Sequence, residues 1–288
     1  MSTRVMRADL PAIQVRDLSF DFDHGAGGLW NPEQPELSHL LNAFQLALPY
    51  LEPYFIDAVK EATPLLGESR IVEAALAFCA QEANHSRQHK RYNRCLKARY
   101  PRIEEFEKAI QQSLVRSRRE DSLEWRLAYT AGYEAITAQL CRWMFRNSEE
   151  LFRGADGHFA ALMLWHGAEE IEHRHVAHDV LCAVTRRYWL RTHGLFAALR
   201  KTERDIRPIV TYMLEVDGLA TDARSRGRRR KLRIRMLRAV LPAVFRYLSP
   251  AYHPSRDAEP EQAVRWLEAH REGRDLRSLD TAGPILAP

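Results

Sequence analysis

Apolar residues recur at every third or fourth position through most of this chain, and strict alternation is confined to one short stretch. Helical spacing carried on good helix formers predicts amphipathic helices rather than strands. The stretch IQVRDLSFDF, residues 13–22, is the one candidate strand. The chain is therefore expected to be all-α, with helices over residues 36–62, 69–98, 102–116, 119–149, 156–185, 188–218, 229–247 and 259–271.

The composition agrees with this expectation. The 288 residues are 45% hydrophobic and include only 13 glycines and 14 prolines, which is few for a chain rich in turns. This length supports one sizeable core. Two prolines, Pro49 and Pro53, fall inside the first predicted helix and are expected to kink or loosen it. We expect three parts: an N-terminal arm over 1–34, a helical bundle over 35–220 and a basic helical extension over 221–288.

The cysteines favour a reducing compartment. Cys79, Cys95, Cys141 and Cys182 are widely spaced, and no pair has the C-x-x-C spacing of many metal and redox sites. The sequence has neither an N-terminal apolar segment of the signal-peptide type nor a run of 18 apolar residues. It therefore predicts a cytoplasmic protein with no membrane span.

The positive charge of the chain is concentrated in one place. The formal net charge is +5, and RSRGRRRKLRIR, residues 224–235, holds eight basic residues and no acid. This segment is either the solvated start of a helix or a surface for an anionic partner. An anionic membrane surface and nucleic acid both stay open, although the absence of interleaved aromatic residues does not favour nucleic acid.

The stretch WHGAEEIEHRHVAHD, residues 165–179, concentrates histidines and carboxylates on one predicted helix. It contains two Glu-x-x-His pairs, and residues three apart share a face of a helix. Glu170 and His173 share their face with mainly apolar residues, so we expect them to point into the core. Glu172 and His175 lie on a more polar face and are expected to be solvated.

A second inward pair lies in FCAQEANHSRQH, where Glu82 and His85 interrupt an apolar stripe. An acid and an imidazole in such a stripe are costly to bury unless they are paired or bind a metal. Glu52 lies among apolar residues thirty positions before Glu82, and Glu134 lies among apolar residues thirty-six positions before Glu170. Each half of the bundle therefore offers a glutamate and then a Glu-x-x-His pair.

This set is what a dimetal four-helix bundle requires, namely one Glu from each of two helices and Glu-x-x-His from each of the other two. We expect Glu82 and Glu170 to bridge the two ions, because each lies on a helix that also supplies a histidine. His166, one turn before Glu170, is a candidate seventh ligand. The competing interpretation is a buried Glu–His–Arg network whose members satisfy one another. The predicted metal ligands are Glu52, Glu82, His85, Glu134, His166, Glu170 and His173.

Three neighbours of this set carry further expectations. Thr137 lies one turn after Glu134 and is the candidate catalytic hydroxyl, unless it bonds back to its own helix. Gly132 is expected to leave room beside the Glu134 carboxylate. His89 and His166 are expected at the same end of the bundle, because the second and fourth core helices should be antiparallel.

The segments FCAQEANHSRQHKRYN and WHGAEEIEHRHVAHDV resemble a bacterial family described as predicted metal-dependent hydrolases, over roughly residues 35–220. The wider pattern is similar to the ferritin-like di-iron carboxylate proteins. That likeness implies a ferritin-like four-helix bundle with additional C-terminal helices. A partial likeness to the bacterial arylamine N-oxygenases rests on His166. Gln81 and Glu169 stand where many ferritin-like di-iron chains carry Asp.

The donor types indicate which metal and reaction to expect. Carboxylates and imidazoles form a hard, oxygen-rich set that suits iron or manganese, whereas thiolates would favour zinc. We therefore expect two iron ions, with manganese as the alternative, and the oxidation of a small organic substrate by dioxygen. A metal-dependent hydrolase stays open because paired ions also activate water. A non-catalytic metal-binding protein and a homodimer also stay open.

Overall fold

The computed structural model describes residues 13–22, 28–283 and 285, and in these residues the chain forms helices and no strand. The all-α prediction is confirmed. The helices are α1 (Pro35–Ala62), α2 (Ser69–Arg99), α3 (Ile103–Glu120), α4 (Leu123–Arg146), α5 (Ser148–Leu151), α6 (Gly157–His173), α7 (Val176–Val184), α8 (Tyr188–Val216), α9 (Ala223–Tyr247) and α10 (Glu261–Arg271), with short 3-10 turns at Thr63–Leu65 and Pro254–Arg256.

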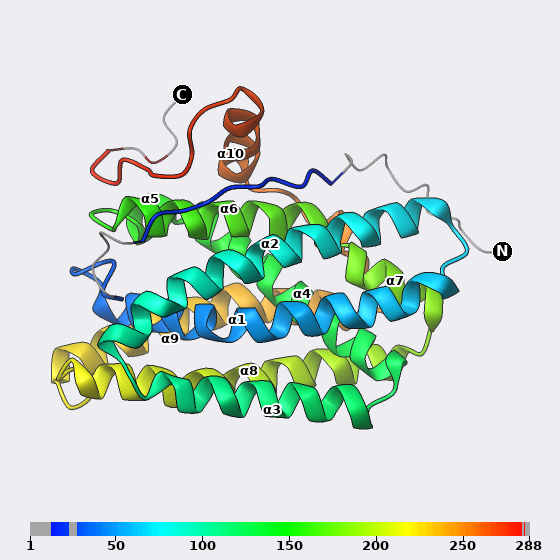
Figure 1. The fold of residues 1–288 in the computed structure, drawn as a ribbon, viewed down its shortest axis with the longest axis horizontal. Helices are drawn as coiled ribbons and strands as arrows, with labels where there is room; N and C mark the ends of the chain where they lie inside the picture. The colour runs from blue at the N-terminus through cyan, green and yellow to red at the C-terminus, as the bar shows by residue number, and fades with distance from the viewer. Residues whose placement is uncertain (1–12, 23–27, 284, 286–288) are drawn as a thin grey trace.

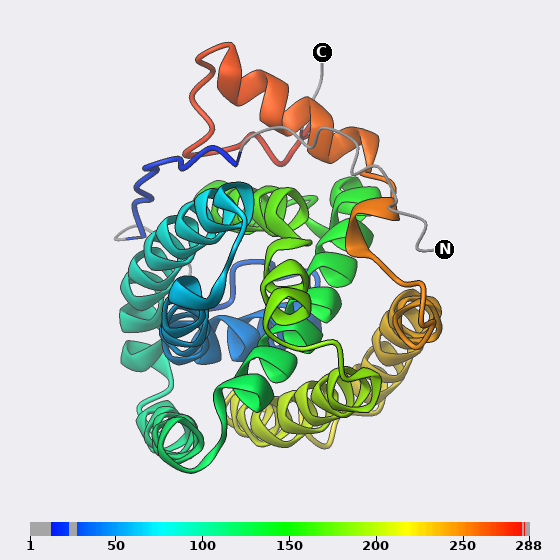
Figure 2. The same ribbon diagram turned by 90° about the vertical axis from the view of Figure 1, so that its right-hand side faces the viewer.

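Four helical elements form the centre of the molecule: α1, α2, α4 and the α6–α7 pair (Figure 1). α1 packs along α2, α4 packs along α6 and α7, and the two pairs contact each other. α3 carries the chain from the end of α2 to the start of α4 outside this bundle, as Figure 1 shows. α8 covers α4 and α1, and α9 packs on α4 at the edge of the molecule (Figure 2). The predicted boundaries at residues 34 and 220 stay predictions.

The close approach of α4 to α8 depends on two glycines. A Cβ atom added to Gly132 would lie 2.6 Å from the Cα atom of Leu195, and one added to Gly194 would lie 2.2 Å from the carbonyl oxygen of Ala128. Both distances are far below van der Waals contact. Gly132 therefore faces α8 and lets two backbones touch, so the expectation that it leaves room beside Glu134 is wrong.

α1 stays helical through Pro49 and Pro53, where the sequence predicted a kink or loosening. Each proline lacks an N–H group, which leaves the carbonyl four residues earlier without its helical donor. α2 supplies the missing donors. Asn93 Nδ2 donates to the carbonyl oxygen of Gln45 at 3.1 Å, and Ser86 Oγ donates to that of Pro49 at 3.4 Å. Side chains of a neighbouring helix thus replace two backbone hydrogen bonds.

The helix predicted over 156–185 is divided immediately after His173. Arg174 donates from Nη1 to the carbonyl oxygen of Ile171, which belongs to the last turn of α6. The same guanidinium reaches the carbonyl of Pro254 at 3.3 Å and the carboxylate of Glu259 at 2.9 Å. This side chain therefore joins the end of α6 to the segment before α10.

The predicted strand over residues 13–22 is also wrong, although its alternating pattern has a structural cause. Arg16, Phe20 and Phe22 are buried and alternate with exposed residues, so the segment is extended. It lies along α2 and α6, where Phe20 packs against Trp165 with ring centroids 5.4 Å apart. The alternation of buried and exposed residues indicates an extended backbone, and among the described residues no second strand pairs with this segment. Residues 1–12 and 23–27 of the predicted arm lie outside the described residues.

Among the described residues, no helix combines the length and the apolar character needed to cross a bilayer.

A double-mutant cycle tests the replacement of backbone donors in α1. Asn93→Ala should lower the free energy of unfolding by about 1–3 kcal/mol, because the buried Gln45 carbonyl loses its donor. Pro49→Ala restores the backbone N–H, so Asn93→Ala should cost less in that background. Urea unfolding of the four proteins measures the coupling. Identical costs in both backgrounds would contradict this account of how α1 tolerates its prolines.

Candidate metal centre

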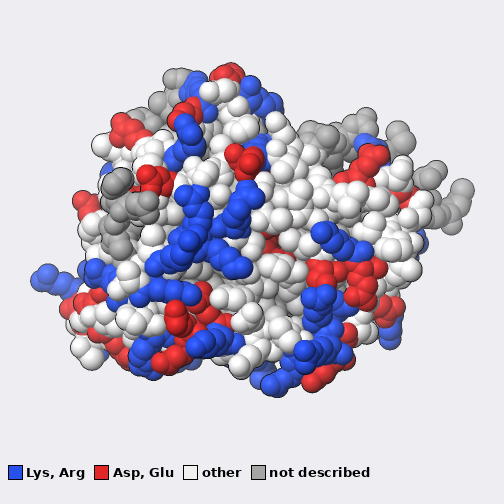
Figure 3. All heavy atoms as spheres, viewed as in Figure 1, with Lys and Arg blue, Asp and Glu red and all other residues white. Residues whose placement is uncertain are grey.

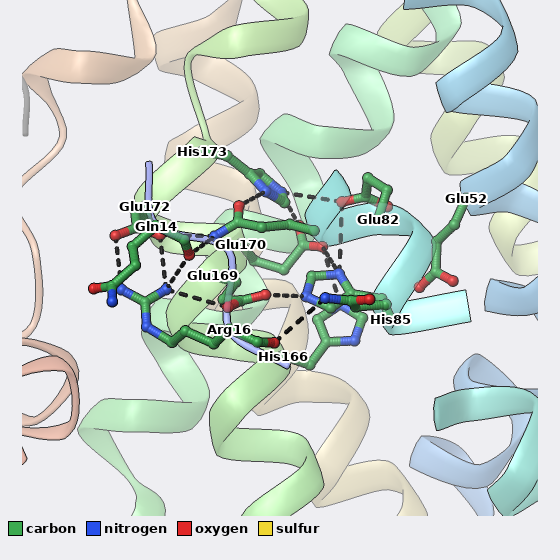
Figure 4. Close-up of polar contacts among 12 residues, drawn as sticks. Gln14, Arg16, Glu52, Glu82, His85, His166, Glu169, Glu170, Glu172 and His173 are labelled. Carbon is green, nitrogen blue, oxygen red and sulfur yellow. Dashed lines mark hydrogen bonds and ion pairs between the residues drawn. The ribbon is translucent and has the colours of Figure 1, made fainter. Parts of the chain in front are cut away.

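All seven predicted metal ligands converge in the middle of the four-helix centre. Figure 4 shows the side chains from α2 and α6 meeting there, with Glu52 of α1 beside them. α4 contributes Glu134. Their donor atoms form two groups, each with all its atoms within 4.8 Å of one another. The first group is Glu52, His85 and His166, and the second is Glu82, Glu134, Glu170 and His173.

Two glutamates lie between the groups. Glu170 places Oε1 at 3.0 Å from His166 Nε2 and Oε2 at 3.5 Å from His173 Nε2. Glu82 Oε1 lies 3.6 Å from His85 Nδ1 and 3.3 Å from His173 Nε2. Each carboxylate therefore contacts one histidine of each group, which is the position that a bridging ligand requires.

The site is fully enclosed, and many of its polar atoms have no hydrogen-bond partner. None of the seven residues is more than 5% exposed. Burying an unsatisfied polar atom costs about 1–3 kcal/mol, so several such atoms aimed at one point indicate a missing partner. The donor set and its charge fit divalent cations. The atoms without a hydrogen-bond partner in the described residues are both Glu52 oxygens, Glu82 Oε1, Glu134 Oε2, Glu170 Oε2, His85 Nδ1 and His173 Nε2.

The pKa values in the cluster show how strongly it requires positive charge. Burial and repulsion from Glu82 raise the pKa of Glu52 well above its ordinary value. Burial and the neighbouring Glu170 raise the pKa of Glu134 to about 8. Burial alone would lower the pKa of His173, but Glu170 and Glu134 raise it well above its usual range. Protons thus offset the negative charge where metal ions would do so more completely.

Each of the two Glu-x-x-His histidines is held by a side chain from the other helix. His85 Nε2 lies 2.9 Å from Glu169 Oε2, and His173 Nδ1 lies 2.9 Å from Gln81 Oε1. Such contacts fix the ring orientation and leave the other nitrogen for a metal. One local signal points to both contacts, because Gln81 and Glu169 immediately precede the two predicted bridging glutamates. The two contacts differ, since a carboxylate holds His85 and an amide holds His173.

The N-terminal arm completes this outer layer through Arg16, which the sequence analysis did not single out. Its guanidinium lies 3.2 Å from Glu169 Oε1 and 2.9 Å from Glu172 Oε2 (Figure 4). Gln81 Nε2 donates to the same Glu172 oxygen at 2.8 Å. Arg16 therefore links both histidine-orienting residues. No local sequence pattern reveals it, because its role depends on the arm folding over α2 and α6.

The prediction that Glu172 and His175 lie on a solvated face is wrong. The Glu172 side chain is only 8% exposed, and His175 is buried. The arm covers Glu172, and the segment before α10 brings His253 near His175. The polar residues of this helix face predict contact with solvent, but segments more than seventy residues away along the chain cover it.

The two additional histidines lie at the same end of the centre, as predicted. His89 contacts His166, His85 contacts Glu169 and Gln81 contacts His173, so residue numbers fall along α2 as they rise along α6 and the two helices are antiparallel. His89 is buried and lies 3.6 Å from Glu52 Oε1. His166 of the first group contacts His89 through Nδ1, and its Nε2 lies 3.0 Å from Glu170 of the second group. Its assignment as the seventh ligand stays a prediction.

The Thr137 hydroxyl bonds back to the backbone of its own helix, which was the alternative to a catalytic role. Its hydroxyl donates to the carbonyl oxygen of Glu134 at 3.1 Å and lies 3.3 Å from that of Tyr133. This is the backbone bond that a threonine commonly makes within a helix. A catalytic role for Thr137 stays a prediction and would require this hydroxyl to turn.

Aromatic rings form the walls of the centre. Phe78 lies edge-on to His173, with ring centroids 4.8 Å apart, and Trp165 lies edge-on to His85 at the same distance. Tyr133 packs against Phe55 at 5.1 Å. These contacts exclude water and strengthen electrostatic interactions inside.

A third group of potential ligands lies apart, formed by His178 and Asp179 of α7 and by His253. His253 Nε2 is 2.8 Å from Asp179 Oδ1, and the group borders a cavity of about 630 Å³. The Arg191 guanidinium lies 3.4 Å from His178 Nε2. A positive charge at that distance opposes a bound cation, so we place the metal centre in the first two groups.

Comparison with known families agrees with a metal-dependent protein. The family model described as predicted metal-dependent hydrolase matches residues 14–258. No curated protein matches the chain, and no solved structure does. The likenesses to ferritin-like di-iron proteins and to N-oxygenases stay predictions.

Removing a bridging carboxylate tests the ligand assignment. Glu82→Ala and Glu170→Ala should each lose most of the bound metal, because each side chain lies between the two groups. Elemental analysis after anaerobic titration of metal-free protein with Fe²⁺ or Mn²⁺ measures this loss. Glu73→Ala, an exposed change on α2, is the control. Two metals per chain in either bridging variant would refute the assignment.

The burial of His175 predicts that the stability of the protein depends on pH. Burial, which Asp179 only partly offsets, lowers the pKa of His175 from 6.5 to about 4. Below about pH 6.5 the His175 imidazole binds a proton in the unfolded chain but not in the folded one. His175 therefore does not destabilise the fold above that pH, and it lowers the free energy of unfolding progressively as the pH falls toward 4. In His175→Asn, the decrease in the free energy of unfolding between pH 7 and pH 4 should be smaller than in the wild type by up to about 3 kcal/mol.

Thermal unfolding between pH 7 and pH 4.5 measures the difference. His193→Asn, a change at an exposed position of α8, is the control. Parallel curves for wild type and His175→Asn would mean that His175 is solvated after all.

Proposed function

The chain belongs to the family described as predicted metal-dependent hydrolase, and on that premise we propose that its bundle holds two metal ions which act on a small substrate. The observation that carries this proposal is the convergence of seven buried donors, several without hydrogen-bond partners, from α1, α2, α4 and α6. Glu52, His85 and His166 would hold one ion. Glu134 and His173 would hold the other, with Glu82 and Glu170 shared.

The donor chemistry supports iron or manganese. Four carboxylates and three imidazoles are hard ligands, and neither group includes a thiolate. Four negative charges would balance two divalent ions, which makes burial of the pair tolerable. Cys79 lies near this region, but burial raises the pKa of its thiol to about 11, so it is a poor source of thiolate.

We favour the oxidation of a small organic molecule by dioxygen. Two bound iron or manganese ions would supply the electrons that dioxygen accepts. The residues of this chain prepare the site for that reaction: Gln81 and Glu169 hold the imidazoles in orientation, and Phe78 and Trp165 keep water away. The enclosure of every ligand supports a small diffusible co-substrate, because dioxygen needs far less access than an extended molecule.

Hydrolysis is the second candidate, and the family comparison supports it more directly than oxidation. Paired metal ions also activate water as a nucleophile.

One set of measurements separates the two reactions. Protein purified without added metal is analysed for iron, manganese and zinc, then reduced anaerobically and exposed to air. Oxidation predicts about two iron or manganese ions per chain and an optical change on air exposure that Glu170→Ala lacks. Hydrolysis predicts no such change, with cleavage of an activated ester or phosphate ester that Glu170→Ala abolishes. Protein that binds no metal under any condition would refute both.

A further inference from the structure

α9 differs from every other helix of this chain in its charge. It spans Ala223–Tyr247 and contains no acidic residue. Asp222 caps its first turn by accepting from the backbone N–H of Ser225 at 2.6 Å. All eight basic residues of the segment 224–235 therefore lie on one regular helix, which confirms that the segment is helical.

Two of these arginines fasten α9 to the bundle. Arg228 forms a bidentate salt bridge with the Glu36 carboxylate, and both of its hydrogen bonds are 2.8 Å long. Arg235 reaches Glu150 at 2.6 Å. Arg229 donates to the carbonyl oxygen of Ala220, and Arg246 pairs with Asp257. Four other basic residues of α9 are exposed and make no ion pair with the described residues: Arg230, Lys231, Arg233 and Arg238.

The outer face of the same helix is apolar toward its C-terminal half. Ile234, Leu237, Leu241 and Phe245 are 39%, 49%, 49% and 68% exposed. Their spacing of three, four and four residues places them on one stripe. Arg233 flanks the stripe on one side, Lys231 and Arg238 flank it on the other, and Arg230 lies one turn before Ile234 at the N-terminal end of the stripe.

A further exposed aromatic residue lies near the end of α9. The Tyr188 hydroxyl donates to the carbonyl oxygen of Leu248 at 2.6 Å, which holds the start of α8 beside the end of α9. Trp189, the next residue, is 71% exposed. Large exposed apolar side chains grouped in this way are uncommon on a surface that faces only water.

α9 lies on the side of the bundle opposite α2, as Figure 2 shows in gold and cyan. The face over α1, α2 and α3 carries one group of basic side chains near its middle, and over much of the rest of it basic and acidic side chains lie next to each other (Figure 3). Arg87 contacts Asp17, Lys97 contacts Glu107 and Arg118 contacts Asp57. What distinguishes α9 is that its unpaired basic residues border an exposed apolar stripe.

We propose that α9 binds the surface of an anionic lipid bilayer, with Ile234, Leu237, Leu241 and Phe245 inserted among the lipids and the flanking basic residues on the headgroups. A helix with an apolar face bordered by lysine and arginine lies in the plane of such an interface. The helix is too polar to cross the membrane, so the contact is peripheral and depends on salt.

Two other occupants fit the surface less well. A second copy of this chain placed face to face would bring the arginines of both α9 helices together, and α9 offers no acid to neutralise them. A nucleic acid would match the charge but would leave Leu241 and Phe245 in water. The bilayer matches both halves of the surface.

The test uses the full chain and two kinds of vesicle, one of phosphatidylcholine alone and one with a third of its lipid replaced by phosphatidylserine. The wild type should sediment with the anionic vesicles and be released by salt. Arg230→Gln/Lys231→Gln/Arg233→Gln should weaken binding by about a hundredfold. Leu241→Ser/Phe245→Ser should weaken it by about tenfold.

A matched charge change elsewhere is the control. Lys108→Gln/Arg119→Gln/Arg271→Gln removes three exposed charges far from α9 along the chain and should bind as the wild type does. An equal loss in this control would reduce the effect to net charge and overturn the proposal. So would a wild type that ignores anionic vesicles. A dimer that Leu241→Ser/Phe245→Ser dissociates, or duplex DNA binding that only the charge variant loses, would assign the face to another occupant.

Discussion

The structure is organised around the electrostatic cost of placing four glutamates within reach of one another in a buried centre. Glu52, Glu82, Glu134 and Glu170 come from four different helices, and none is more than 3% exposed. Carboxylates at such distances cannot all be ionised in a poorly polar interior unless positive charge lies among them. The raised pKa values of Glu52 and Glu134 and the unpartnered oxygens are consequences of that single constraint. A pair of divalent cations satisfies it with the donors already in place.

The same constraint explains the layers around the centre. Metal-binding imidazoles need fixed orientation, and here Gln81 and Glu169 provide it across the α2–α6 interface. A buried carboxylate such as Glu169 must in turn be neutralised, and Arg16 lies against it. The N-terminal arm is therefore part of the site, although it runs outside the bundle. Its extended conformation allows Arg16 and the buried aromatic residues of the arm to reach inward at alternate positions.

The molecule separates two kinds of chemistry in space. The centre is enclosed by aromatic rings and by the backbone contact between α4 and α8 that Gly132 and Gly194 permit. α9 instead carries its apolar residues and unpaired positive charges outward. It is attached through Arg228 and Arg235, so its outer face is free of the bundle's packing. Association of α9 with an interface would leave the buried centre unchanged.

The sequence alone determined the helices and the inward faces that carry the seven predicted ligands, because helical period and apolar neighbours are local properties. The likeness to a ferritin-like bundle predicted that α2 and α6 are antiparallel, which the contacts of His85, His89 and His173 across the two helices confirm. Local pattern failed where distant segments cover a surface. The polar face of Glu172 is covered by the arm, and the carbonyl groups freed by Pro49 and Pro53 are satisfied from α2. Only the tertiary structure decides such matters, since the partner that neutralises a charge or supplies a donor lies far away in sequence and leaves no periodic trace.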